Sequence, residues 1–236
     1  MTTATPSRRD RQRSATVAEI KDTARRLLVT GGPAAISLRA IARDMGMTAP
    51  AIYRYFPSLD ALVLAIVTDL FEELRASVEV AAKEHAEEPP LTRIAHMARA
   101  FRRWSRAHPA EFGLIFGNPM LGVTSFAAHC SPVNDAGARF GETFFTVLEE
   151  HQAAHPIQGQ LPELPELVFG RYIDTFGDRF PLPVIYLFVS AWTRLYGIVA
   201  MEVFGHLEWA MTDAEPLFEL ELTRTLQTWA RYGGSP

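Results

Sequence analysis

Apolar residues recur at intervals of three or four positions along most of the chain, the spacing that places them on one face of an α-helix. Sustained alternation of apolar and polar residues, the pattern of β-strands, is absent, and no hairpin dipeptide separates such runs. The pattern predicts an all-α protein with helices near residues 15–30, 37–45, 48–56, 58–82, 91–107, 111–116, 132–154, 167–176, 182–204 and 213–232.

Two short helices and a tight turn are predicted in the segment 37–56. Ser37 and Thr48 are residue types that cap helix N-termini, and Pro50 falls in a first helical turn, where its missing N–H is harmless. Gly46 stands where the first helix needs a left-handed residue at its end. This arrangement is typical of a helix-turn-helix, whose second helix many proteins insert into the DNA major groove.

The second helix of the motif presents a small reading surface. Ile52 and Phe56 are predicted to point inward, and the remaining positions share the outward and N-terminal surfaces: Thr48, Ala49, Pro50, Ala51, Tyr53 and Arg54. The alanines offer only methyl contacts, for instance to a thymine methyl group. For Tyr53 and Tyr55 two alternatives remain open, a hydroxyl contact to phosphate or a place in the small helical core.

Charge is unevenly distributed along the chain. The whole sequence has a net charge of −4, whereas residues 1–60 carry +5 and the rest is acidic. Residues 1–14 contain Arg8, Arg9, Arg11 and Arg13 without apolar anchors, which predicts a disordered basic arm. Such an arm can follow phosphates or enter a minor groove, with Arg11 and Arg13 as candidate DNA contacts. The alternative is a solvated tail with no specific role.

The run SLRAIARDMGMTAPAIYRYFPSLDALV, preceded by a helix and a Gly-Gly break, resembles the N-terminal domain of TetR-type transcriptional repressors. The resemblance covers about residues 14–65. It implies DNA contacts from Ser37, Arg39, Thr48, Ala49, Pro50, Tyr53 and Arg54. One departure is Leu59, which stands where the family often has a lysine that contacts phosphate.

The resemblance also implies a division of the chain. A three-helix helix-turn-helix domain is expected at 15–60, and a helical effector-binding and dimerisation domain at 61–236. In this family the last two helices pair with their copies as a four-helix dimer interface. The stretch AWTRLYGIVAMEVFG is similar to a subclass with a Trp-x-x-x-His-Gly signature, although Tyr196 replaces the histidine.

Aromatic residues are frequent in the second half, and apolar clefts between helices are where small molecules bind. The candidate ligand-binding residues are Trp104, Phe112, Phe116, Phe144, Phe145, Tyr172, Phe176 and Trp192. The competing interpretation is that an aromatic stripe at helical spacing simply forms core.

Other kinds of site find little support in the sequence. The only close histidine pair at helical spacing, His151 and His155, offers too few ligands for zinc, so we predict no metal and no cofactor. A single cysteine, Cys130, excludes an internal disulfide and suits a reducing cytoplasm. The apolar run 184–204 is interrupted by polar residues and is predicted to be a buried helix, with no membrane span. No nucleotide-binding or nucleophile motif is present, so we predict no enzymatic activity.

These observations favour a cytoplasmic DNA-binding transcriptional regulator, a repressor that a small apolar ligand releases from a near-palindromic operator. The alternative is a helical small-molecule-binding protein or enzyme that retains a vestigial DNA-binding head. The sequence identifies neither the effector nor the operator.

Overall fold

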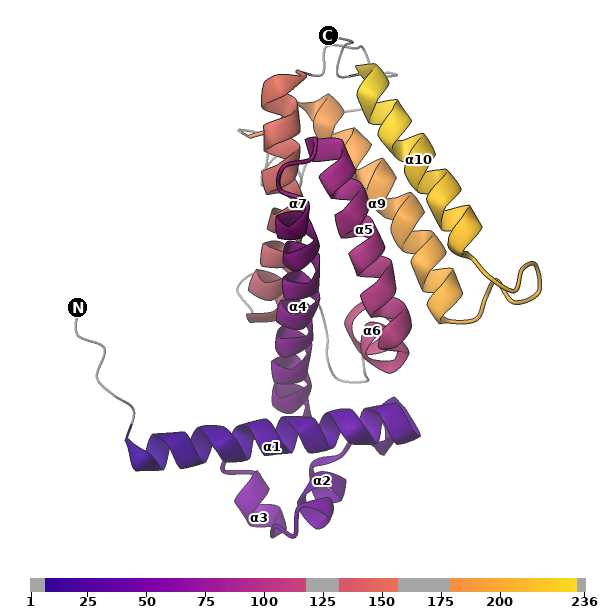
Figure 1. Cartoon of the computed structure of the whole chain (residues 1–236). Coiled ribbons are helices and arrows are strands. Elements are labelled where there is room, and N and C mark those ends of the chain that lie inside the picture. The colour runs from indigo at the N-terminus through magenta and orange to yellow at the C-terminus, as the bar shows by residue number, and fades with distance from the viewer. Residues whose placement is uncertain (1–6, 118–131, 157–178, 233–236) are drawn as a thin grey trace. The chain divides into compact units, whose positions relative to one another are not determined.

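The computed structural model describes residues 7–117, 132–156 and 179–232, and every regular element within them is a helix. The helices are α1 (Arg8–Gly31), the 3₁₀-helix η1 (Pro33–Ala35), α2 (Leu38–Asp44), α3 (Ala49–Ile52), α4 (Leu59–Glu84), α5 (Pro90–Ala107), α6 (Pro109–Phe116), α7 (Pro132–Ala154), α9 (Leu182–Val203) and α10 (Glu215–Tyr232) (Figure 1). The prediction of an all-α fold is confirmed. The helix predicted at 167–176 lies outside the described residues.

The chain forms two compact units. The first comprises Met1–Leu74 and His108–Phe140, and the second comprises Arg75–Ala107 and Gly141–Pro236. The division differs from the one predicted at residue 60, because α4 continues as one helix past that point and α6 joins the N-terminal helices. The first unit therefore contains more than the helix-turn-helix.

The first helix begins earlier than the sequence pattern predicts. It starts at Arg8, so the prediction of a disordered arm is wrong for residues 8–14. The physical reason is a capping box: the Asp10 backbone N–H donates to the Ser7 hydroxyl (3.2 Å), and the Ser7 N–H donates to the Asp10 carboxylate (3.2 Å). Two otherwise unpaired backbone donors are satisfied, and the arginines lie on a helix rather than on a free tail.

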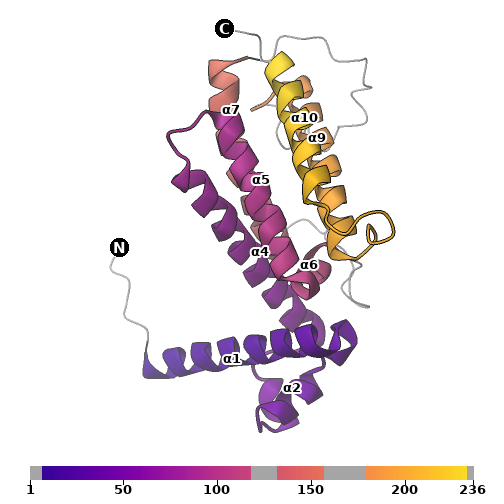
Figure 2. The ribbon, with the colours of Figure 1, turned by 45° about the vertical axis from the view of Figure 1, so that its right-hand side comes forward.

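The N-terminal helices share a small apolar core. Ile20, Ala24 and Leu28 lie four residues apart on one face of α1, and each is at most 1% exposed. Ile41 of α2 and Ile52 of α3 are equally buried. Figures 1 and 2 show α2 on the same side of α1 in both views. The long α1 thus serves as the support on which the two short helices are held.

A single guanidinium connects α1 to two other helices of the first unit. Arg25 donates from Nη1 to Glu73 Oε2 of α4 (2.7 Å) and from Nε to Glu111 Oε1 of α6 (2.9 Å). The hydrogen bond to Glu73 raises the pKa of Arg25, burial opposes this, and Glu111 adds to the rise. Glu111 is only 4% exposed, so its negative charge depends on Arg25 for compensation.

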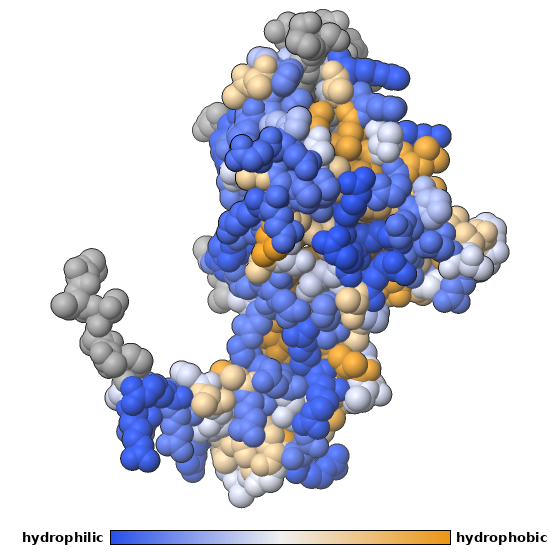
Figure 3. All heavy atoms as spheres, in the orientation of Figure 1, coloured by the Kyte–Doolittle hydropathy of each residue, from blue (hydrophilic) through white to orange (hydrophobic). Residues whose placement is uncertain are grey.

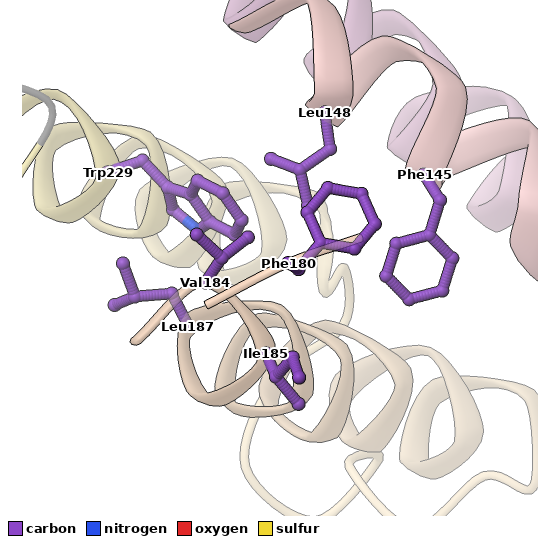
Figure 4. Packing of buried hydrophobic residues seen from close by; sticks show 7 residues of the cluster. All are labelled: Phe145, Leu148, Phe180, Val184, Ile185, Leu187 and Trp229. Atoms are coloured by element: carbon purple, nitrogen blue, oxygen red, sulfur yellow. The ribbon is translucent and has the colours of Figure 1, made fainter. Parts of the chain in front are cut away.

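The second unit is built on a core shared by α7, α9 and α10. Figure 4 shows Phe145 and Leu148 of α7 facing the first turns of α9 and Trp229 of α10. The ring of Phe145 lies 5.3 Å from that of Phe180 and 4.4 Å from that of Phe188, measured between centroids. These aromatic contacts fix where α9 begins against α7.

Ion pairs join α5 to the last two helices of the second unit. Arg102 of α5, 7% exposed, donates from Nε and Nη2 to the two carboxylate oxygens of Glu202 on α9, at 2.8 and 2.7 Å. Arg99, one turn earlier, forms the same two-bond pair with Glu219 of α10 at 2.8 and 2.7 Å. Bidentate ion pairs of this kind constrain the orientation of the guanidinium and are stronger than pairs with a single hydrogen bond.

Much of α9 remains uncovered within one chain. It is the one helix among the described residues that is long and apolar enough to cross a membrane, yet only 22% of its most apolar 18-residue window is buried. Figure 3 shows hydrophobic residues exposed among hydrophilic ones in the region of α5, α9 and α10. A single chain therefore does not bury this helix as the sequence pattern predicts.

Replacing Arg25 tests the three-helix connection. In Arg25→Gln the buried carboxylate of Glu111 loses its compensating charge, and we expect the free energy of unfolding to fall by about 2 kcal/mol. Solvent limits the loss, because 31% of the Arg25 side chain is exposed. Urea denaturation followed by circular dichroism measures the change.

The matched control is Lys21→Gln, one turn earlier on α1, which removes an ion pair with Asp69 whose carboxylate is 53% exposed. We expect a change below about 1 kcal/mol for this surface pair. Equal losses in the two variants would contradict the special role of Arg25.

Candidate functional site

The helix-turn-helix starts with the predicted cap. The Ala40 backbone N–H donates to the Ser37 hydroxyl (3.1 Å), and Leu38, Ile41 and Ala42 bury the inner face of α2. The prediction that Ser37 caps this helix is confirmed. The hydroxyl accepts this bond and retains its own proton, which can still be donated to an external acceptor.

The turn between α2 and α3 depends on a glycine. Gly46 has φ +64°, a left-handed conformation that side chains with a Cβ rarely adopt. A Cβ placed there would meet nothing within 4 Å, so the requirement comes from the backbone rather than from space. The next N–H, from Met47, donates to the Ala42 carbonyl (2.8 Å) and closes the end of α2. The prediction for Gly46 is confirmed.

The start of α3 leaves polar groups accessible. Thr48 occupies the N-cap position with extended backbone, as predicted, but its side chain makes no capping hydrogen bond. Pro50 lies within the first turn of the helix. Thr48, Ala49 and Pro50 are all exposed, so the first turn of α3 is an open surface.

The remaining predicted contacts surround this turn. Tyr53 is 48% exposed, and Arg39 and Arg54 are exposed, whereas Ile52 and Phe56 are buried. Tyr53 is therefore not part of the core. Tyr55 is half-buried beneath Arg13 of α1, whose guanidinium carbon lies 5.3 Å from the ring centroid.

Arg13 has a local structural partner that the sequence did not indicate. Its Nη2 donates to the backbone carbonyl of Arg54 (3.3 Å), just past the end of α3. Together with the contact to Tyr55, this bond joins the first turns of α1 to the end of α3. Arg11 is exposed on the same helix. Contacts from Arg11 and Arg13 to DNA stay predictions, now from a helical rather than a disordered segment.

The chain then enters α4 through another cap. The Ala61 backbone N–H donates to the Ser58 hydroxyl (3.1 Å). Leu59, the first residue of α4, is half-buried and offers no donor for phosphate. The lysine contact to phosphate that is frequent in the family therefore has no side-chain counterpart at this position.

An apolar groove lies inside the second unit, between α5, α7, α9 and α10. Its empty space is about 700 Å³ including the part open to solvent, but the centre of a water molecule can occupy only about 60 Å³ of it. The aromatic residues that line it are Phe101, Phe144, Phe188, Trp192, Tyr196, Phe218 and Trp229. A ligand of more than a few atoms would have to displace side chains.

Tyr196 and Trp192 add polar groups to a mostly apolar lining that also includes Thr225. Their rings stack with centroids 5.5 Å apart, and Trp192 also lies 5.4 Å from the ring of Phe101. Burial raises the pKa of Tyr196, so its hydroxyl remains protonated at neutral pH. The pair can offer an O–H and an indole N–H to a ligand.

Only part of the predicted ligand set lines this groove. Phe144 and Trp192 do, whereas Trp104 is buried in the packing of α5 and Phe145 belongs to the core shown in Figure 4. Phe112 and Phe116 belong to the first unit, where the ring of Phe116 lies 5.8 Å from that of Phe71. Tyr172 and Phe176 lie outside the described residues.

The sequence had shown the apolar faces of α5, α9 and α10 but not which positions meet. Phe101, Tyr196 and Trp229 were visible as members of these faces, yet helical periodicity does not reveal how four helices are rotated against one another. The signal in the sequence that could have indicated the groove was Tyr196, which stands in place of the histidine of the subclass signature.

Histidines come together at two places in the second unit. The rings of His151 and His155 stack with centroids 5.2 Å apart, and burial lowers the pKa of His151, which favours the neutral form of that imidazole. His85, Glu88 and His96 bring three ligand atoms within 4.8 Å of one another. The second cluster is a candidate metal site. It was not predicted from the sequence, because only histidine pairs at helical spacing were considered there.

Two family models match the chain. Residues 20–66 match the model described as bacterial regulatory proteins of the tetR family, and residues 94–225 match the tetracyclin repressor-like C-terminal domain. The chain is 30% identical over 215 residues to the HTH-type transcriptional regulator Rv1816 of Mycobacterium tuberculosis, and the match covers 89% of both proteins.

Solved structures agree with these matches. The crystal structure of the regulatory protein SCO4313 shares 31% identity with a TM-score of 0.72, covering 94% of this chain and all of that one. A TetR family regulator from Shewanella sp. PV-4 has the same fold at 16% identity, with a TM-score of 0.56 and coverage of 90% and 94%. The chain belongs to the TetR family of DNA-binding transcriptional regulators.

Proposed function

We propose that this regulator is a repressor that binds a near-palindromic operator as a homodimer and leaves it when a small apolar ligand enters the groove of the second unit. The observation that carries the DNA half of the proposal is the exposed first turn of α3. Thr48, Ala49 and Pro50 stand open to solvent there, and a buried core holds the turn from behind.

Contacts to bases come from few side chains. The first turn of α3 enters the major groove, where Thr48 bonds a base edge or phosphate and Ala49 touches a thymine methyl group. Tyr53 and Ser37 each direct a hydroxyl to phosphate. Arg39 and Arg54 are exposed, long cationic side chains, and they supply phosphate contacts that depend on salt.

A second copy of the chain supplies the discrimination that one small surface lacks. Exposed apolar residues at the end of α9 and on α10 support a dimer through these helices: Met201 and the C-cap residue Phe204 are each 42% exposed, and Leu220 is 47% exposed. Burying such residues against a copy removes apolar area from water on both chains. The symmetric pair then presents two reading helices to two half-sites.

The groove and the DNA-binding helices are connected through the chain itself. α5 lines the groove and follows α4, and α4 runs without a break from Leu59 in the first unit to Glu84 in the second. A ligand that favours one position of α5 over another biases α4, and with it the spacing of the two heads. A coupling of about 1.4 kcal/mol is sufficient to weaken operator binding tenfold.

The DNA surface is tested with the duplex immediately upstream of the chain's own coding sequence. We expect Thr48→Ala and Tyr53→Ala to weaken binding by about fivefold or more, because each removes a contact worth about 1–3 kcal/mol. Fluorescence anisotropy at physiological salt gives the dissociation constants.

A control that removes charge outside the first unit is Arg103→Gln, an exposed position on α5. The affinity of this variant for the duplex should stay within about twofold of the affinity of the wild type. Unchanged binding by both α3 variants would refute the assigned surface, and no specific binding by the wild type would favour the alternative of a small-molecule-binding protein.

The dimer is tested by light scattering on an eluting chromatography peak. The wild type should have twice the chain mass of 26.3 kDa, and Leu220→Arg should run as a single chain at micromolar concentration because the new charge would be buried. Val80→Arg on α4, where the native side chain is 51% exposed, is the matched control and should stay dimeric. A dimeric Leu220→Arg protein would place the interface elsewhere.

The groove is tested with a neutral fluorescent probe, N-phenyl-1-naphthylamine. Ala191 lines the groove, so Ala191→Phe should fill it and weaken probe binding at least tenfold. Ala153→Phe, at an exposed position of α7, should bind the probe as the wild type does. Equal binding by the wild type and Ala191→Phe would show that apolar ligands bind elsewhere.

A further inference from the structure

The turn that joins α4 to α5 brings together three residues that neither the family match nor the proposed function uses. His85 directly follows α4, Glu88 lies in the turn, and His96 lies on α5. The Ala86 N–H donates to the Lys83 carbonyl (3.2 Å) and the Glu88 N–H to the His85 carbonyl (3.0 Å), which fixes the path of the turn. All three residues belong to the second unit.

The side chains of this cluster are arranged around the Glu88 carboxylate. Nδ1 of His85 lies 2.9 Å from Oε1 of Glu88, and Nε2 of His96 lies 3.3 Å from Oε2. The two imidazole rings stack in parallel, with centroids 3.4 Å apart and planes inclined by 7°. Each ring therefore directs one nitrogen towards the same carboxylate.

The spacing of these atoms matches that of metal ligands. Zinc binds imidazole nitrogen and carboxylate oxygen at about 2.0–2.2 Å, which places neighbouring ligands of a tetrahedral ion about 3.3 Å apart. The two nitrogen-to-oxygen distances of 2.9 and 3.3 Å are close to this value, and the three ligand atoms lie within 4.8 Å of one another. To share one ion, the two rings have to rotate out of their parallel stack, because the lone pair of each ligating nitrogen lies in the plane of its own ring.

The local charge also favours a cation. Glu84 and Glu87 are exposed on either side of His85, while the neighbouring Lys83 is 78% exposed and pairs with Glu79 at 3.7 Å.

We propose that His85, Glu88 and His96 bind one divalent transition-metal ion of the zinc class, with solvent completing the coordination. Two imidazoles and one carboxylate suit zinc, cobalt or nickel better than magnesium or calcium, which prefer oxygen ligands alone. All three side chains are partly exposed, so an ion has access from solvent. The prediction of no metal site rested on spacing within one helix, whereas His85 and Glu88 lie in the turn after α4 and His96 lies on α5.

Titration calorimetry of the full-length, tag-free, chelator-treated protein with zinc chloride tests this site. We expect one zinc ion per chain, with affinity at least tenfold weaker in His85→Ala, His96→Ala and Glu88→Gln. Glu87→Gln, which removes a carboxylate from the same turn, should bind as the wild type does. Zinc should also raise the melting temperature of the wild type but not of the ligand variants.

Cobalt substitution gives an independent measurement. The wild type with one equivalent of cobalt should show visible absorption bands of a low-symmetry nitrogen and oxygen site, and Glu88→Gln should lose or shift them. Glu88→Gln preserves side-chain size, so it reports on the site even if a histidine variant fails to fold. Absence of stoichiometric zinc binding, or equal binding by all three ligand variants, would overturn the proposal.

Discussion

The buried carboxylate of Glu111 imposes a constraint on which the first unit depends. A charge that is 4% exposed requires a partner, and Arg25 provides it while also holding Glu73. One guanidinium thereby fixes α1, α4 and α6 against one another. Because α1 also supports α2 and α3, the position of the reading surface depends on where α4 and α6 lie. A regulator needs this kind of connection between its DNA-binding surface and the rest of its helices.

The surface of α3 that we propose to contact DNA carries few side chains. Its first turn carries Thr48, Ala49 and Pro50, which can distinguish few bases, and Arg13 reinforces the end of α3 from α1. The scarcity of long donors makes the geometry of the turn, set by Gly46 and the Ser37 cap, more important than any single contact. It is also the reason why we propose a symmetric pair of heads, which the exposed apolar residues on α9 and α10 support.

Features governed by local physics were predictable from the sequence. The Ser37 cap, the left-handed Gly46, the inward Ile52 and the all-α fold follow from neighbours along the chain, and each is confirmed. The start of α1 was predicted too late in the chain, because residues 1–14 were judged by their lack of apolar anchors and the capping box at Ser7 was not considered. Contacts between distant segments were not predictable: Arg25 and Glu111 are 86 residues apart, and the lining of the groove depends on how helices rotate against one another. The His85, Glu88 and His96 cluster was missed because these residues are close in sequence but do not share one helix, so helical spacing does not reveal that the turn after α4 brings them together.

The central claim is that the chain reads DNA through the α2–α3 unit as a symmetric pair. A hydroxyl-radical footprint on the DNA upstream of its own coding sequence, at physiological salt, tests this most directly. The account predicts two protected patches related by a two-fold axis, with major-groove centres about 10 base pairs or a multiple of that apart. A single protected half-site, or uniform weak protection along the whole duplex, would contradict it.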